Sequence, residues 1–340
     1  MKVGLVGFGV SGKSTVFSAL TGAVPTAGKG ALGAIGVPDE RIDRLVAMWS
    51  PRKTTYAEIA FEDYSPGSFG AGEGAVTPAV LGQMRTLDVL AEVVDAFSGG
   101  GLSGVTKRVA GFHAELVLGD LAIVEKRLDR LTRERGKAGE TELLERCRAA
   151  LEADRELRQL DLGETETELL SGFQFLTLKP RLVVANVSEA DAGTDSAALR
   201  ESLSQWDLDA VILCAPLEYE LTQLGSDERR EFLAGFGLEA GARDRFVEVC
   251  YRMLDLITFL TAGEDEVRAW PIRRGTTAVD AAGKVHSDIA RGFIRAEIIA
   301  YDDYVSLGSE SACRQAGKLR MQGKDYVMND GDVVHFRFNV

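Results

Sequence analysis

Apolar residues recur along much of the chain as short, nearly unbroken runs separated by polar or glycine-rich stretches. The runs stand at residues 2–6, 89–94, 182–185 and 210–214, and residues 58–63 form a further expected strand that ends in an acidic residue. Runs of this length are typical of strands buried on both faces of a parallel sheet. After the first run, Val16, Phe17 and Leu20 follow a helical spacing, so strand, glycine loop and helix predict an α/β opening. Two glycine-rich stretches, 22–36 and 67–74, are predicted to be loops.

Residues 112–172 have a different pattern, because they are charged and rich in leucine. Their apolar positions follow a three-four-three spacing, at Leu121, Val124, Leu128 and Leu131. This spacing predicts a narrow helical seam. Gly136 and Gly139 interrupt it, and a second helix is expected from Thr141, which makes an antiparallel helical hairpin inserted into the α/β domain. We interpret the seam as packing within the hairpin rather than as a zipper for a partner.

After Leu260 the apolar positions predict a small α+β domain. Short strands are expected over residues 266–270, 293–299, 325–328 and 333–338. Gly275 to Thr277 marks a turn that starts a helix, and Asn329 to Asp332 is a turn between two strands. This domain closes the chain.

Composition narrows the possible functions. The chain has 340 residues, which predicts two or three domains, and its net charge of −13 does not favour binding to nucleic acid or to an anionic membrane through the overall field. No apolar run reaches the roughly 20 residues that span a bilayer, and Met1 to Gly4 does not begin a secretory signal. Four cysteines stand far apart, which indicates reduced thiols. We therefore expect a cytoplasmic protein with no membrane or DNA partner.

The loop after the first strand carries the strongest chemical signal. Its sequence fits G-x-x-x-x-G-K-[ST] at every fixed position, with Gly7, Phe8, Gly9, Val10, Ser11, Gly12, Lys13 and Ser14, followed by Thr15. Glycines in such a loop let backbone N–H groups cradle phosphate oxygens, and the helix that follows adds its dipole. Lys13 is expected to reach the β- and γ-phosphates, as the catalytic residue, and Ser14 to ligate Mg²⁺. The segment from Gly7 to Thr15 is therefore predicted to be a nucleotide-binding P-loop.

Two further segments could complete such a site. Asp63 closes a predicted strand and is a candidate second ligand of Mg²⁺, although a strand-end cap explains it equally well. Asn186, Val187 and Glu189 follow another buried strand, at the strand end where ligands of such sheets bind. An amide and an acid at this place can read base edges, but they are also ordinary loop residues.

Together these residues resemble the YchF/Obg-like ATPase family of P-loop proteins, over nearly the whole chain. Asn186 to Glu189 is similar to the family's N-x-x-E form of the guanine-reading N-K-x-D motif, which is associated with ATP. Cys214 and Ala215 are similar to the fifth motif, whose backbone meets the base. Further matching stretches are Val37 to Asp43, Asp120–Leu121, Phe175 to Pro180, Phe259 to Gly263, Glu266 to Trp270, Gly292 to Glu297 and Gly331 to Val340.

The resemblance implies a G-protein-like, doubly wound P-loop domain at residues 1–111 and 173–256. It further implies the inserted hairpin at 112–172 and a TGS domain, a ubiquitin-like β-grasp module, at 257–340. The implied function is a cytoplasmic ATPase with Mg²⁺ that contacts ribosomes through the TGS domain and the hairpin. In the last domain, the basic candidates for that contact are Arg273, Arg274, Lys318, Arg320 and Lys324.

The sequence also departs from the family where hydrolysis is controlled. Pro66 replaces the glycine whose N–H would contact the γ-phosphate, and proline has no N–H to donate. The stretch from Thr26 to Gly36 lacks the usual switch sequence, and 97–105 lacks the family's histidine. His113 lies further on, inside a predicted helix. Nucleotide binding is therefore better supported than turnover, and a weakly active adaptor or a GTPase remain the alternatives to an ATPase.

Overall fold

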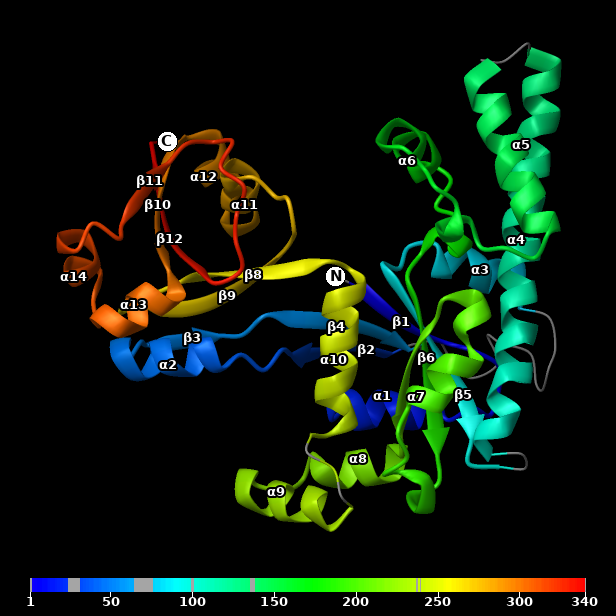
Figure 1. Cartoon of the computed structure of the whole chain (residues 1–340), viewed down its shortest axis with the longest axis horizontal. Helices are drawn as coiled ribbons and strands as arrows, with labels where there is room; N and C mark the ends of the chain where they lie inside the picture. Colours follow the sequence, from blue (N-terminus) through cyan, green and yellow to red (C-terminus); the bar gives the residue numbers. More distant parts are fainter. Residues whose placement is uncertain are drawn as a thin grey trace. The chain divides into compact units, whose positions relative to one another are not determined.

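The computed structural model describes residues 2–23, 31–63, 76–98, 101–134, 138–236, 238 and 240–339. The chain divides into two compact units. The first contains Met1–Ile35 and Ile59–Phe246, and the second contains Gly36–Glu58 and Val247–Val340. Figure 1 traces both units in sequence colours.

A six-stranded sheet forms the centre of the first unit, in the order β2-β4-β1-β5-β6-β7. The strands are β1 (Lys2–Val6), β2 (Ala31–Gly36), β4 (Glu58–Asp63), β5 (Val89–Ala96), β6 (Arg181–Val187) and β7 (Asp209–Leu213). The strands β4, β1, β5, β6 and β7 are mutually parallel. Every residue of β6 is buried, as an apolar strand covered on both faces requires. The predicted loop at 22–36 is wrong for residues 31–36, which form the edge strand β2.

Helices cover this sheet and extend from it. They are α1 (Lys13–Thr21), α3 (Pro78–Met84), α4 (Val105–Glu134), α5 (Ala138–Glu152), α6 (Glu164–Ser171), α7 (Ala197–Ser202), α8 (Ala215–Leu221), α9 (Ser226–Gly235) and α10 (Ala242–Met253). Helix α1 packs against α8 and β1, whereas α4 packs against α3 and β5. A doubly wound α/β sheet of this kind was expected from the sequence.

The long helices α4 and α5 form the predicted hairpin and lie side by side (Figure 1). Val124, Leu128 and Leu131 are buried against Leu144 and Cys147 of α5. The seam is therefore used for packing within the chain, as interpreted from the sequence. Helix α4 begins at Val105 and runs directly from the sheet into the hairpin.

A buried carboxylate fastens α4 to the segment that leads into β6. Asp120, with no exposed surface, accepts hydrogen bonds from the backbone N–H groups of Leu176 (3.1 Å) and Thr177 (2.8 Å). It also accepts from the Thr177 hydroxyl (2.8 Å) and from Arg85 Nη1 (2.7 Å). One side chain thus satisfies two backbone donors that would otherwise be buried without a partner.

The second unit is built on another six-stranded sheet, in the order β11-β10-β12-β8-β9-β3. Its elements are α2 (Glu40–Trp49), β3 (Lys53–Thr55), β8 (Leu256–Thr261), β9 (Glu266–Arg273), α11 (Ala278–Val285), α12 (Ser287–Arg291), β10 (Phe293–Ala300), α13 (Tyr301–Leu307), α14 (Glu310–Gln315), β11 (Arg320–Gln322) and β12 (Asp332–Phe338). Thr277 caps α11, at the predicted helix start. The predicted strand at 325–328 is wrong, because only Val327 forms a bridge there, to Thr277.

Residues 36–58 belong to this second unit through strand pairing, core packing and an ion pair. Strand β3 pairs in parallel with β9, and Ile42 and Leu45 of α2 are buried in the same core as Leu260. The Arg41 guanidinium donates hydrogen bonds to the carboxylates of Asp39 and Asp330, both at 2.8 Å. In the described part of the chain, no helix is both long and apolar enough to cross a bilayer.

Candidate functional site

The loop between β1 and α1 depends on two glycines with positive φ. Gly7 has φ +124°, and a Cβ there would lie 2.5 Å from the carbonyl oxygen of Val93. Gly12 has φ +85°, and a Cβ there would lie 2.4 Å from Asn186 Nδ2. Side chains are excluded at both positions by conformation and by space. The loop can therefore curl tightly between the strand and the first turn of α1, which begins at Lys13.

Lys13 reaches back over this loop. Its Nζ donates to the carbonyl oxygens of Gly7 (2.9 Å) and Phe8 (2.7 Å). Ser11, which is buried, donates its hydroxyl to the same Phe8 carbonyl at 3.1 Å. The ammonium group is thus held at the mouth of the loop, beside a helix N-terminus that attracts anions.

Val10 stands at the tip of the loop in a strained conformation. Its φ is +64°, in the left-handed region that β-branched residues rarely adopt, and its side chain is 84% exposed. Gly9 beside it is partly exposed. The tip therefore presents backbone and one apolar side chain to solvent rather than packing into the protein.

Asn186, near the end of β6, ties the loop to the start of α8. Its Nδ2 donates to the Ser11 carbonyl (3.2 Å), and its Oδ1 accepts from the Ala215 N–H (3.2 Å). The side chain is buried. A carboxamide has two N–H donors and two lone pairs on oxygen, so these two bonds leave one donor and one acceptor of Asn186 unused. Three segments far apart in sequence thus meet at the carboxyl edge of the sheet.

Of the other residues predicted to contact the nucleotide, two are buried and two are exposed. Val187 is buried in β6, and Cys214 is buried at the N-cap of α8, where burial raises the pKa of its thiol. Glu189 is exposed in a short 3₁₀ turn, Glu189–Asp191, and Thr15 is exposed in the first turn of α1. The structure brings Ser11, Gly12, Asn186 and Ala215 together, whereas Glu189 lies on the surface of its turn.

The expected metal ligands share one edge of the sheet. Ser14 is in the first turn of α1, and Asp63 ends β4 with its backbone opposite Leu5 of β1. Hydroxyl and carboxylate oxygens are donors that suit Mg²⁺. The Asp63 side chain, Thr26 and Pro66 lie outside the description. Within the described residues, no group of three or more His, Cys, Asp or Glu side chains is arranged to hold a metal.

Phe97 is a neighbour of the loop that the sequence did not single out. Its ring would lie 3.8 Å from a Cβ on Gly12, and the side chain is 46% exposed. Asp95 fixes this position by accepting from the N–H groups of Phe97 (3.1 Å) and Ser98 (3.0 Å). An exposed aromatic ring directly after a buried strand is the signal that could have identified it.

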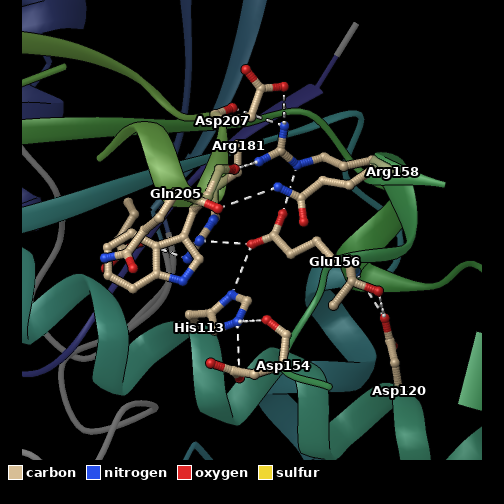
Figure 2. A network of polar contacts seen from close by, with 12 residues as sticks. His113, Asp120, Asp154, Glu156, Arg158, Arg181, Gln205 and Asp207 are labelled. Atoms are coloured by element: carbon tan, nitrogen blue, oxygen red, sulfur yellow. Dashed lines mark hydrogen bonds and ion pairs between the residues drawn. The ribbon is translucent and has the colours of Figure 1, made fainter. Parts of the chain in front are cut away.

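His113 is a packed residue, one of the two environments expected for it. It is buried in α4, with Nδ1 3.0 Å from Glu156 Oε1 and Nε2 3.1 Å from the Asp154 carbonyl. Figure 2 shows it below Glu156, which also contacts Arg158. These contacts with Glu156 and Asp154 explain the histidine structurally.

Comparison with known proteins agrees with this architecture. Residues 256–339 match the family YchF-GTPase_C, described as a protein of unknown function (DUF933). The chain is 35% identical to "Ribosome-binding ATPase YchF" of Bacillus subtilis (strain 168) and 36% identical to the protein of that name from Pasteurella multocida (strain Pm70). The first alignment covers all of both chains, and the second covers all of this chain and 99% of the relative.

A solved structure extends the likeness to three dimensions. "Structure of the Schizosaccharomyces pombe YchF GTPase" superposes with a TM-score of 0.86 at 27% identity, over 99% of this chain and 97% of that one. A GTP-binding protein from Pyrococcus horikoshii OT3 shares the fold, with a TM-score of 0.63 at 20% identity. The P-loop α/β sheet, the inserted hairpin and the second, β-grasp sheet are therefore those of a known architecture, and the chain belongs to the YchF family.

Proposed function

We propose that this protein binds ATP with Mg²⁺ at the loop from Gly7 to Thr15 and uses the nucleotide to control an association with ribosomes. The observation that carries the proposal is the Asn186 carboxamide, which joins the Ser11 carbonyl to the Ala215 N–H. The same loop binds the Lys13 ammonium through the Phe8 carbonyl. Curated relatives named as ribosome-binding ATPases support it. Such a protein acts in the cytoplasm.

The remaining donor and acceptor of Asn186 favour adenine over guanine. An Asn side chain can form two hydrogen bonds with adenine: its amide N–H donates to N7, and its amide oxygen accepts from the N6 amino group. Guanine presents acceptors at both N7 and O6, so the amide oxygen would face another acceptor. Glu189, in place of the usual aspartate, is exposed and is free in our proposal to face the solvent side of the base. In this proposal the backbone of Cys214 and Ala215 contacts the base, and the ring of Phe97 forms an apolar wall beside it.

The other roles follow from chemistry. Lys13 would offset the negative charge of the β- and γ-phosphates. Ser14 and Asp63 would hold Mg²⁺ at the same edge of the sheet. Mg²⁺ would neutralise charge that develops on the phosphates. Because Pro66 cannot donate an N–H to the γ-phosphate, we propose slow hydrolysis to ADP and phosphate. Loss of one such donor costs on the order of 10²-fold in rate.

Calorimetry on nucleotide-stripped protein tests binding and selectivity. ATP with Mg²⁺ should bind more tightly than GTP, and Lys13→Ala should abolish the binding of both. Lys126→Ala, which changes an exposed lysine of α4, is the matched control and should bind as the parent does. Equal affinity for ATP and GTP would refute the role given to Asn186, and tighter binding of GTP would favour a GTPase, which is the name of the solved Schizosaccharomyces pombe relative.

Phosphate release measured with the same samples separates an ATPase from an adaptor. Slow release that Lys13→Ala eliminates indicates turnover at this site. Binding without release, with and without ribosomes, would establish a nucleotide-binding adaptor, the second function we consider because of Pro66.

Ribosome association is tested by co-sedimentation. In the second unit, Arg273 is exposed at the end of β9, and Arg274 pairs with Asp255 at 2.9 Å. Lys318 and Arg320 face Asp303 and Asp332, and Lys324 is exposed. Because Arg274, Lys318 and Arg320 already face acidic partners, we propose Arg273 and Lys324 as the main contacts. Arg273→Glu should weaken co-sedimentation, and Lys284→Glu on α11 should not.

A further inference from the structure

A charged network is buried inside the first unit, and its residue Glu92 lies opposite Val6, just before the loop that begins at Gly7. Glu92 stands in the middle of β5, Arg181 begins β6, and Glu156 caps the 3₁₀ turn Leu157–Gln159 that follows the hairpin. Each of the three residues is 1% exposed. Figure 2 shows the part of this network around Glu156. Charged residues in strands that are otherwise apolar require a specific reason, because burying a charge is costly.

Two carboxylates share one guanidinium in this network. Arg181 Nη1 lies 3.1 Å from Glu92 Oε2, and Arg181 Nη2 lies 2.7 Å from Glu156 Oε1. Glu156 has further partners in Arg158 (2.6 Å) and His113 (3.0 Å). Within the described residues, Arg181 is the single polar contact of the Glu92 carboxyl. Arg181 Nε and Nη2 are both buried without a hydrogen-bond partner among the described residues, so Nη2 meets Glu156 as an ion pair and the guanidinium is not locked by a full set of bonds.

The two carboxyl groups therefore have opposite preferences for charge. Burial raises the pKa of Glu92 to about 8, against the attraction of Arg181, and the charge of Glu156 raises it further. Burial acts in the same direction on Glu156, but Arg181, His113 and Arg158 together lower its pKa to about 2. The polar partners of Glu156 favour its charged form beside Arg181, whereas burial favours the protonated form of Glu92.

Glu156 lies in the segment that anchors the base of the hairpin. Arg158, which it binds, donates to the carbonyl oxygens of Trp206 and Asp207, just before β7. His113 connects the same carboxylate to α4. The contacts of Glu156 therefore join the end of α5 to α4, to β6 and to the approach to β7.

We propose that Glu92 is a proton-operated switch for this anchor. When neutral, Glu92 leaves the Arg181 guanidinium to Glu156, and the segment after the hairpin is held against the sheet. When ionised, Glu92 competes for the guanidinium and repels Glu156, and the segment loosens. Arg181 and Glu156 are the charged groups that face Glu92, and both are needed for the switch.

Trp206 provides a reporter for the test. Its ring centre lies 5.8 Å from that of His113, and its side chain is 8% exposed. The chain has three tryptophans, so Trp49→Phe with Trp270→Phe leaves Trp206 as the sole fluorophore. In this background, acrylamide quenching is measured from about pH 6 to about pH 9. Quenching should rise severalfold with a midpoint near 8, the pKa of Glu92.

Glu92→Gln should abolish that rise while keeping Trp206 protected, because the amide fills the same space without a charge. Glu125→Gln, an exposed change on α4, is the control and should keep the rise. An identical rise in Glu92→Gln, or no rise in the parent, would overturn the proposal. Should Glu92→Gln fail to fold, infrared spectra of the parent decide, since a neutral carboxylic acid band must be present at neutral pH and disappear through the same midpoint.

Discussion

Asp120→Ala is the sharpest test of how the hairpin is joined to the sheet. The substitution removes the acceptor of two buried backbone N–H groups, those of Leu176 and Thr177. It also removes the ion-pair partner of Arg85. Each buried donor left without a partner costs about 1–3 kcal/mol, so the free energy of unfolding should fall by about 4 kcal/mol. Asp120→Asn keeps the shape and one acceptor oxygen, and should cost roughly half as much.

Urea denaturation of the Trp49→Phe, Trp270→Phe background, followed by the fluorescence of Trp206 in the same unit, measures this loss. The midpoint should shift to lower urea while the slope stays unchanged, because native packing is otherwise kept. Asp129→Ala, an exposed change on the same helix, should stay within about 0.5 kcal/mol of the parent. A loss below about 1 kcal/mol for Asp120→Ala would refute the reasoning, since it would mean that water or another group satisfies those donors.

Three further predictions concern single backbone or side-chain features. Gly12→Ala should abolish ATP binding in calorimetry, because a Cβ there lies 2.4 Å from Asn186 Nδ2 and φ is +85°; retained affinity would contradict the described loop. Val10→Asn should raise the free energy of unfolding by about 1 kcal/mol in urea, because asparagine tolerates the φ of +64° better. Asp330→Ala should destabilise the second unit by about 1–2 kcal/mol, since it releases the Thr258 N–H that it binds at 2.8 Å; an unchanged melting temperature would argue against that bond.

The sequence alone was sufficient for features that depend on neighbours along the chain. The glycine pattern from Gly7 to Gly12 predicted a loop that only residues without a Cβ can form, and the structure has positive φ at both glycines. The unbroken apolar run at 182–185 predicted a buried strand, and the three-four-three spacing from Leu121 predicted the hairpin seam. In each case the pattern reports a requirement of the single residue or segment, a missing Cβ or an apolar face, whichever distant residues then meet it.

Tertiary structure decided what depends on contacts between distant segments. Strand β2 was missed because its glycines and small residues have little strand propensity, and its place at a sheet edge gives it pairing that propensity does not reveal. The pairing of β3 with β9 connects residues far apart in sequence, which no local pattern encodes.

The same holds for the site and for the buried network. Asn186 was expected to read a base, but its bonds to Ser11 and Ala215 depend on two parallel strands and a loop that meet only in the fold. Glu92 and Arg181 are single charges in apolar runs, and the sequence does not show that they face each other across β5 and β6. Side-chain partners over such separations are set by strand order and register, which the whole fold determines rather than any one segment.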